Sequence, residues 1–161
     1  MAPMKLNLCC GIRLLDGFLN VDKVDIGRYF PDAVKNKDFM VCDLNTKPWP
    51  WLNETADVIV MRDGLEHLAS GSFVENMEEV WRILVPDGEF ACQVPDATTP
   101  QAFVDPTHTT FFTHLSMDYF DPDKLLCQML PHYSSCRFHI VKAEPTKDMG
   151  LHFILRKIPH V

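Results

Sequence analysis

The chain has 161 residues, 47% of them hydrophobic and 23% charged, which are the proportions of a folded globular domain and exclude a disordered tail. Its formal net charge is -7, and a surface of that sign repels a phosphate backbone, which argues against nucleic acid as a partner. The length predicts a single domain over residues 1–161.

The cysteine pattern and the hydropathy predict a cytoplasmic protein that does not enter a membrane. No stretch approaches the roughly 18–20 consecutive apolar residues of a membrane span, and the apolar stretch near the N-terminus is too short for a signal peptide. Cysteines inside apolar runs behave as small core residues and suit a reducing compartment. Most of the six fall in such runs (LNLCCG, FMVCDL, FACQV), and none forms a C-x-x-C pair. The six are Cys9, Cys10, Cys42, Cys92, Cys127 and Cys136.

Short apolar runs recur along the chain and predict seven strands. Runs of this kind, bounded by glycine, proline or aspartate, are typical of buried strands in a sheet covered on both faces. In chain order they are Lys5–Cys10, Phe18–Val21, Phe39–Cys42, Asp57–Met61, Glu89–Val94, Arg137–Ala143 and Leu151–Ile158.

One helix is predicted clearly, between the fourth and fifth strands. Ser70 or Ser72 can cap its start, with Glu75 placed as in a capping box, and Pro86 and Gly88 end it. Apolar side chains recur between these limits at helical spacing: Phe73, Val74, Met77, Val80, Trp81 and Leu84.

The alternation of strands and helices predicts an α/β fold with a doubly wound, mostly parallel seven-stranded sheet. The last two strands, joined by a turn at Thr146–Gly150, would add an antiparallel edge strand. Only about six residues separate Gly11 from the second strand, whereas a full crossover needs roughly 10–12. We therefore expect the first helix to be vestigial or replaced by a loop.

The ends of the predicted strands indicate a nucleoside-containing ligand, because ligands of open α/β sheets bind beyond the carboxyl ends of the strands. Gly11 lets the backbone approach a ligand, Asp22 can accept hydrogen bonds from ribose hydroxyls, and Asp43 could face an adenine amino group. Each aspartate alone is more often a cap or turn residue, but the three positions together favour a ligand. The chain has no G-x-G-x-x-G motif for a pyrophosphate and no P-loop.

Six segments in order resemble a group of small class I S-adenosylmethionine-dependent methyltransferases. The segments are LNLCCG, GFLNVDK, CDLNTKPWPW, DVIVMRDGLEHL, VWRILVPDGEF and DPTHTTFFT. In that family the comparable stretches run approximately LNLGCG, GFINVD, DLNKPLPF, HVLEH, RVLKPGG and DPTH. The resemblance covers residue 4 to about residue 120. It implies a Rossmann-like fold, S-adenosyl-L-methionine as cofactor and S-adenosyl-L-homocysteine as product.

The resemblance also implies roles for individual residues. Asp22 would bind the ribose hydroxyls of the cofactor, and Glu66 and His67 fall on the family's LEH segment. The other implied cofactor contacts are to the methionine part (Leu8, Cys10, Gly11), to the adenine (Asp43, Leu44) and beside the sulfonium and the acceptor (Arg62, Asp63).

Two departures from the family pattern bear on activity. Cys9 stands where the family has glycine, and Asp63 stands where it has histidine. A side chain at Cys9 could crowd the cofactor loop. These departures keep two alternatives open: a catalytically impaired binding module that acts through a protein partner, and an enzyme that uses the cofactor for another reaction.

A methyl acceptor that must lose a proton needs a general base. His108, with Asp105 beside it, is the first candidate and Asp63 the second, but the loop Asp105–His108 is equally well interpreted as structural. The acidic charge favours a small or carbohydrate-like acceptor. Trp49 and Trp51 could shield an adenine or simply pack on the sheet.

Two further expectations concern metals and partners. No histidine or cysteine pair has the spacing of a zinc site, so no metal is expected; His108 with His114, and His132 with Cys136, come nearest. The chain starts directly at the first strand, whereas many relatives carry preceding helices that cover the cofactor. A homo-oligomer or a partner protein could therefore cover an open cofactor site.

Overall fold

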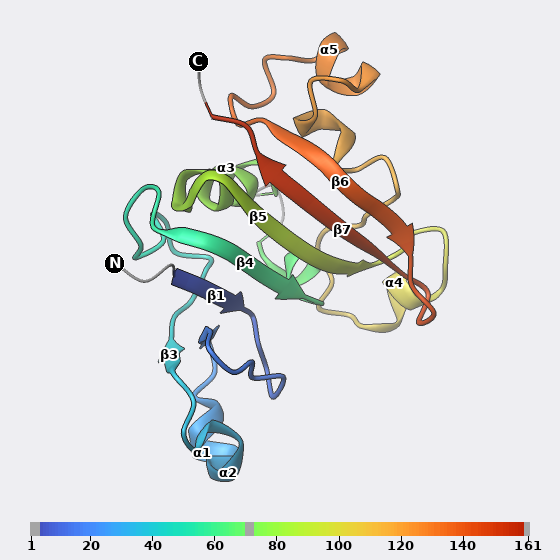
Figure 1. The fold of residues 1–161 in the computed structure, drawn as a ribbon. Helices are drawn as coiled ribbons and strands as arrows, with labels where there is room; N and C mark the ends of the chain where they lie inside the picture. The colour runs from blue at the N-terminus through green and yellow to red at the C-terminus, as the bar shows by residue number, and fades with distance from the viewer. Residues whose placement is uncertain (1–3, 70–72, 160–161) are drawn as a thin grey trace.

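A computed structural model describes residues 4–69 and 73–159. Its centre is a seven-stranded sheet in the order β3-β2-β1-β4-β5-β7-β6 (Figure 1). The strands are β1 Met4–Leu8, β2 Leu19–Asp22, β3 Phe39–Val41, β4 Ala56–Arg62, β5 Leu84–Pro95, β6 Phe138–Pro145 and β7 Gly150–Lys157. This sheet confirms the predicted Rossmann-like α/β fold, and all seven predicted strands are present.

The strands β3, β2, β1, β4 and β5 run parallel, and β7 is antiparallel to both β5 and β6. The closing pair of strands thus forms the predicted antiparallel edge, with β7 inside and β6 outermost. Strand order reverses between β1 and β4, since the chain goes to β2 and β3 on one side and to β5 on the other. A ligand site is expected where these neighbouring strands end.

Helices are few. Among the described residues only α3, Phe73–Ile83, exceeds five residues, and it packs beside β5 through Met77, Val80 and Ile83. The caps predicted at Ser70 and Ser72 lie outside the described residues. The shorter helices are α1 Ile26–Tyr29, α2 Pro31–Val34, η1 Leu65–His67, α4 Gln101–Val104, η2 Asp118–Phe120 and α5 Leu125–Met129. No helix in the described part of the chain has the length and apolar character needed to cross a membrane.

The predicted helix and the following strand meet earlier than expected. Strand β5 begins at Leu84, which pairs with Ala56, and the pairing then shifts so that Val58 lies opposite Glu89. The residues between form a turn within the strand, where Asp87 has a φ of 61°. The predicted stop at Pro86 and Gly88 is therefore a bulged turn inside β5.

The loop between β1 and β2 replaces the first helix, as predicted. Its backbone is held by two buried asparagines. Asn20 donates to the carbonyls of Leu15 and Phe18 and accepts from the Leu15 amide, at 3.1, 3.1 and 2.7 Å. Asn7 donates to the carbonyl of Arg13 and to Asn20, both at 2.8 Å. Because buried backbone groups need partners, these side chains supply the hydrogen bonds that a helix would have made.

Candidate active site

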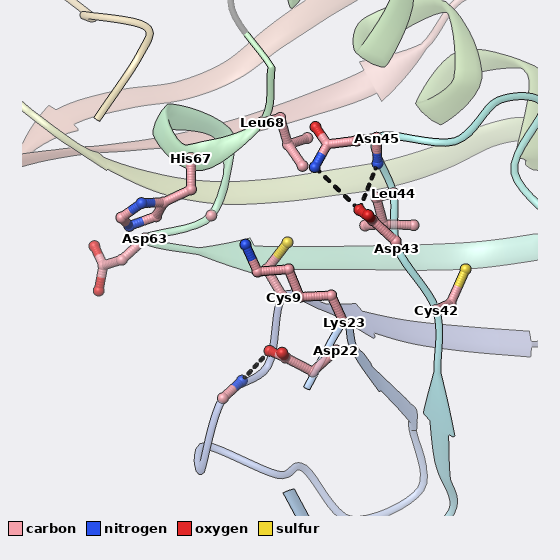
Figure 2. A pocket seen from close by; sticks show the side chains of 12 residues that line it. Cys9, Asp22, Lys23, Cys42, Asp43, Leu44, Asn45, Asp63, His67 and Leu68 are labelled. Carbon is pink, nitrogen blue, oxygen red and sulfur yellow. Dashed lines mark hydrogen bonds between the residues drawn. The ribbon is translucent and has the colours of Figure 1, made fainter. Parts of the chain in front are cut away.

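A pocket of about 230 Å³ lies at the carboxyl ends of β1, β2, β3 and β4 (Figure 2). This is the edge of the sheet at which the strand order reverses, as the position of a ligand site requires. Its lining consists of Cys9, Gly11, Asp22, Lys23, Cys42, Asp43, Leu44, Asn45, Asp63, Gly64, His67 and Leu68.

Asp22 stands at the end of β2 and points into this pocket (Figure 2). One of its carboxylate oxygens accepts from the Gly11 amide at 2.8 Å, and the other accepts from the Val24 amide at 2.9 Å. Each carboxylate oxygen can accept about two hydrogen bonds, so both keep acceptor capacity for a ligand. The side chain is thereby oriented while its capacity to bind hydroxyl groups remains.

Asp43, Leu44 and Asn45 form the opposite wall. Asp43 accepts from the backbone and side-chain N–H groups of Asn45, both at 3.0 Å, which shapes the turn. Leu44 presents an apolar surface, and its carbonyl accepts from Trp49 Nε1 at 2.9 Å. An apolar side chain beside an acceptor matches the face and the amino edge of a purine.

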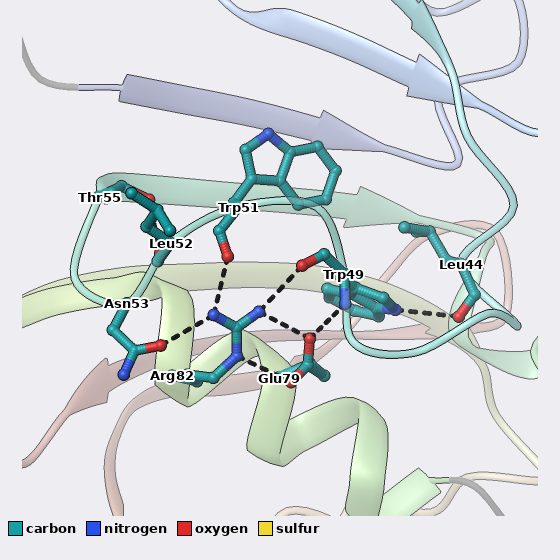
Figure 3. Close-up of polar contacts among 8 residues, drawn as sticks. All are labelled: Leu44, Trp49, Trp51, Leu52, Asn53, Thr55, Glu79 and Arg82. Carbon is teal, nitrogen blue, oxygen red and sulfur yellow. Dashed lines mark hydrogen bonds and ion pairs between the residues drawn. The ribbon is translucent and has the colours of Figure 1, made fainter.

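The loop that carries Trp49 is fixed by Arg82 and Glu79 of α3 (Figure 3). Arg82 donates to the carbonyls of Trp49 and Trp51 at 3.1 and 2.7 Å, to Asn53 at 2.9 Å, and twice to Glu79 at 2.8 Å. Both tryptophans are buried, and neither lines the pocket. Both pack in the core, and Trp49 also holds Leu44 through its hydrogen bond to the Leu44 carbonyl.

Cys9 lines the pocket at a φ of 52° and packs against Gly64. A Cβ added at Gly64 would lie 2.7 Å from the Cβ of Cys9 and 2.9 Å from the Met61 Cγ. The family segments have glycine at the first position and, in HVLEH, valine at the second. The two differences are complementary in size, so the missing side chain at Gly64 makes room for Cys9. Burial, and then the charge of Asp22, raises the pKa of the Cys9 thiol to about 12.

Asp63 lies at the boundary of the pocket at a φ of 51° and forms an ion pair of 2.6 Å with Arg13. Three other predicted cofactor residues lie outside the pocket lining. Leu8 is fully buried in the core, Cys10 is buried beside the β1–β2 loop, and Arg62 is exposed and turned toward Gln93. The predicted contacts that line the pocket are Gly11, Asp22, Asp43, Leu44 and Asp63.

A second cavity, of about 480 Å³, adjoins the first, and Asp63 and His67 line both. Its further lining includes Arg13, Arg62, Glu66, Gln93, Gln101, Asp105, His108 and Asp148. A ligand in the first pocket and a polar molecule in the second would thus meet at Asp63 and His67.

Glu66 is the unusual residue of this second cavity. The residue is 1% exposed, and neither of its carboxylate oxygens has a hydrogen-bond partner within residues 4–69 and 73–159. Burial raises the pKa of this carboxyl to about 7, and the charges of Asp63 and Asp105 add to the effect. A buried polar group without a partner costs about 1–3 kcal/mol, more when it is charged.

His67 and His108 lie beside Glu66, with ring centroids 4.7 Å apart. The Nδ1 of His108 contacts the Ala102 carbonyl at 2.7 Å. Asp105, predicted beside His108, accepts from the amide and the hydroxyl of Thr107, at 2.8 and 2.7 Å. That hydroxyl lies 2.9 Å from the Nδ1 of His67. The Ala102 carbonyl of α4 therefore orients His108, and Thr107 of the following loop orients His67.

Several residues that line the two cavities are not singled out by the sequence. Lys23, Asn45 and Leu68 line the first pocket, and Gln93 and Gln101 line the second. Lys23 directly follows the predicted Asp22, and Asn45 directly follows the predicted pair Asp43 and Leu44, which is a usable signal. The others reach the cavities only through the folding of distant segments.

Comparisons with known proteins identify structures of the same fold but no matching family. No family model matches the chain, and no curated protein matches it. Among solved structures, the chain resembles an S-adenosylmethionine-dependent methyltransferase from Aquifex aeolicus, with 12% identity and a TM-score of 0.65. That match covers 97% of this chain and 82% of the other.

Two further structures carry the same fold. One is a chain of a Haloferax volcanii complex that contains the Trm112 methyltransferase activator: identity is 14%, coverage 99% of this chain and 83% of that one, and the TM-score 0.67. The other is 1,6-didemethyltoxoflavin-N1-methyltransferase from Burkholderia thailandensis with bound S-adenosylhomocysteine: identity is 16%, coverage 98% and 72%, and the TM-score 0.63. The chain therefore has the fold of S-adenosylmethionine-dependent methyltransferases.

Proposed function

We propose that the chain is an S-adenosylmethionine-dependent methyltransferase whose acceptor is small or carbohydrate-like. The observation that carries the proposal is the pocket at the reversal of strand order, lined by Gly11, Asp22, Asp43 and Leu44. The fold shared with methyltransferases and the order of the sequence segments support it. A cytoplasmic location is part of the same proposal and is supported by six cysteines that are all free.

The pocket residues fit the cofactor. The two oxygens of Asp22 retain acceptor capacity for a pair of ribose hydroxyls. Gly11 lines the pocket at a φ of 49°, and a Cβ there would meet nothing within 4 Å, so this backbone faces open space. Leu44 offers an apolar surface for adenine. S-adenosylmethionine would supply a methyl group already activated by its sulfonium.

The protein's part in the transfer is to bind, to align and to handle a proton. Asp63 and His67 line both cavities, so an acceptor in the second cavity would face the cofactor there. His108, held in a loop with Asp105, or else Asp63, would take the proton from a hydroxyl or an ammonium acceptor. General bases of this kind contribute about 10²–10⁴-fold.

We also propose that a second copy of the chain or a partner protein covers the open side of the cofactor pocket. The similarity to a chain of the complex that contains the Trm112 activator supports this proposal.

Calorimetric titration with S-adenosylmethionine and S-adenosylhomocysteine tests the proposal. We expect micromolar binding by the wild type and a loss of about 10–100-fold in Asp22→Ala, since a hydrogen bond to a charged group contributes about 1.5–3 kcal/mol. Asp38→Ala, an exposed aspartate before β3 and outside the pocket lining, should bind as the wild type does. No binding of either ligand would refute the proposal, and tight binding without transfer to any acceptor would identify the binding module.

A further inference from the structure

The cluster formed by Glu66, His67 and His108 has the composition of a metal site. Each residue offers one ligand atom, and these atoms lie within 4.8 Å of one another. Two imidazoles and one carboxylate are a recurrent ligand set of zinc and of other divalent transition metals. Since a zinc ion holds nitrogen ligands at about 2.0–2.1 Å, side-chain rotations that move these atoms by about 1 Å would close them on an ion.

The hydrogen bonds around the two histidines select the same tautomer. A carbonyl only accepts, so His108 donates Nδ1–H to Ala102 and keeps a free lone pair on Nε2. The hydroxyl of Thr107 gives its one proton to Asp105 and therefore accepts from Nδ1 of His67. Both rings are left with an unprotonated Nε2. A metal-binding histidine is fixed by its second nitrogen in the same way, through a carbonyl or through a group that leads to a carboxylate.

The third ligand, Glu66, supplies an independent observation. Its carboxylate is almost fully buried, lines the second cavity and has no hydrogen-bond partner in the described part of the chain. A cation between Glu66 and the two imidazoles would satisfy both oxygens and neutralise the charge.

Backbone contacts hold the three ligands together before any ion binds. The Glu66 carbonyl accepts from the amides of Thr109 and Thr110, at 2.7 and 3.3 Å, and the hydroxyl of Thr109 donates to the Leu68 carbonyl at 2.6 Å. The loop that carries His108 is thus attached to η1, which carries the other two ligands. A preformed site of this kind loses little conformational freedom on binding.

From this geometry we propose that Glu66, His67 and His108 bind one divalent transition metal ion, with Zn²⁺ as the probe. The remaining coordination positions face the second cavity, where water or an oxygen atom of a bound molecule would complete the shell. In the metal-bound protein the Nε2 of His108 is a ligand, so Asp63 is the remaining candidate base. The metal site does not depend on cofactor binding.

The test is calorimetric titration of the chelator-treated full chain with Zn²⁺ in a reductant that does not bind metals. We expect one ion per chain and a loss of at least about 100-fold in Glu66→Gln and in His108→Ala. Thr107→Val should weaken binding about 10–100-fold through His67, as loss of a ligand's hydrogen-bond partner does. His114→Ala removes an exposed histidine outside the cluster and should bind as the wild type does.

Two further measurements test whether cysteines bind the metal and whether the metal site is independent of the cofactor pocket. Co²⁺ bound to the wild type should give a spectrum of nitrogen and oxygen ligation without thiolate charge transfer. Asp22→Ala should bind Zn²⁺ normally, which separates failure of this site from failure of the cofactor pocket. The proposal is overturned if the wild type binds no Zn²⁺, if Glu66→Gln binds it as the wild type does, or if the Co²⁺ spectrum shows thiolate ligands.

Discussion

Two glutamates of this chain, Glu66 buried and Glu79 partly buried, lie in opposite environments. Glu79 accepts three hydrogen bonds, from the Trp49 amide at 2.6 Å and twice from Arg82 at 2.8 Å. Glu66 accepts none through its side chain within residues 4–69 and 73–159. Hydrogen bonds hold the pKa of Glu79 below its ordinary value despite burial, whereas burial raises that of Glu66 to about 7. The satisfied glutamate stabilises a loop, and the unsatisfied one indicates a ligand site.

The largest expected effect comes from breaking the satisfied cluster. Arg82→Met removes five hydrogen bonds and leaves Glu79 without its cation. We expect a loss of about 3 kcal/mol in the free energy of unfolding, measured by urea denaturation. A loss below about 0.5 kcal/mol, within the range of ordinary surface substitutions, would contradict the structural role of this cluster.

The packing before η1 gives the next test, because Gly64 immediately precedes the helix that carries Glu66. Gly64→Val places a side chain against Cys9 and Met61 and should cost about 2 kcal/mol, as overpacking of a core does. Adding Cys9→Gly should recover part of this stability, although Cys9→Gly alone is destabilising. Purely additive losses in thermal denaturation would show that the two positions are not coupled.

Neutralising each glutamate should have effects of opposite sign in the metal-free protein. Glu79→Gln weakens the ion pair with Arg82 and should lower the free energy of unfolding by about 1–2 kcal/mol, and with it the melting temperature. Glu66→Gln replaces a buried charge that has no partner among the described residues, and it should raise the free energy of unfolding by a similar amount. Equal destabilisation of both variants at pH 8 would show that Glu66 has stabilising partners.

The smallest expected effect is a difference between the wild type and Glu79→Gln in how far acid lowers the free energy of unfolding. The lowered pKa of Glu79 means that its stabilisation is complete above the ordinary value of 4.5 and is lost as the pH falls through the folded-state value. We therefore expect the difference in unfolding free energy between pH 6 and pH 3 to be smaller in Glu79→Gln. An unchanged difference would show that Glu79 does not titrate with folding.

The residues at the strand ends that line the first pocket could be predicted from the sequence, because strand ends in a parallel sheet meet at one edge. Asp22 and Asp43 each follow a short apolar run, and both line the pocket with Gly11 and Leu44. The loop in place of the first helix was also predictable, from the short distance between Gly11 and Phe18.

The cluster in the second cavity could not be predicted in this way. Glu66 and His108 are about forty residues apart, and they meet only because backbone bonds attach the loop after β5 to η1. Spacing rules for zinc ligands detect neighbours in sequence, such as His108 with His114 and His132 with Cys136, and they do not detect the spatial cluster of Glu66, His67 and His108. The resemblance assigns Leu8 and Cys10 to the methionine part of the cofactor, but neither lines the first pocket. Arg62, expected beside the sulfonium and the acceptor, lines the second cavity.

The central claim is that the pocket beside Asp22 binds the methyl donor. A crystal structure of the chain with S-adenosylhomocysteine tests it most directly. We predict that the ribose hydroxyls lie within hydrogen-bond distance of Asp22, that the adenine packs on Leu44, and that the sulfur lies toward Asp63 and His67. A ligand bound elsewhere, for example in the aromatic pocket between Phe112 and Tyr119, would contradict the account.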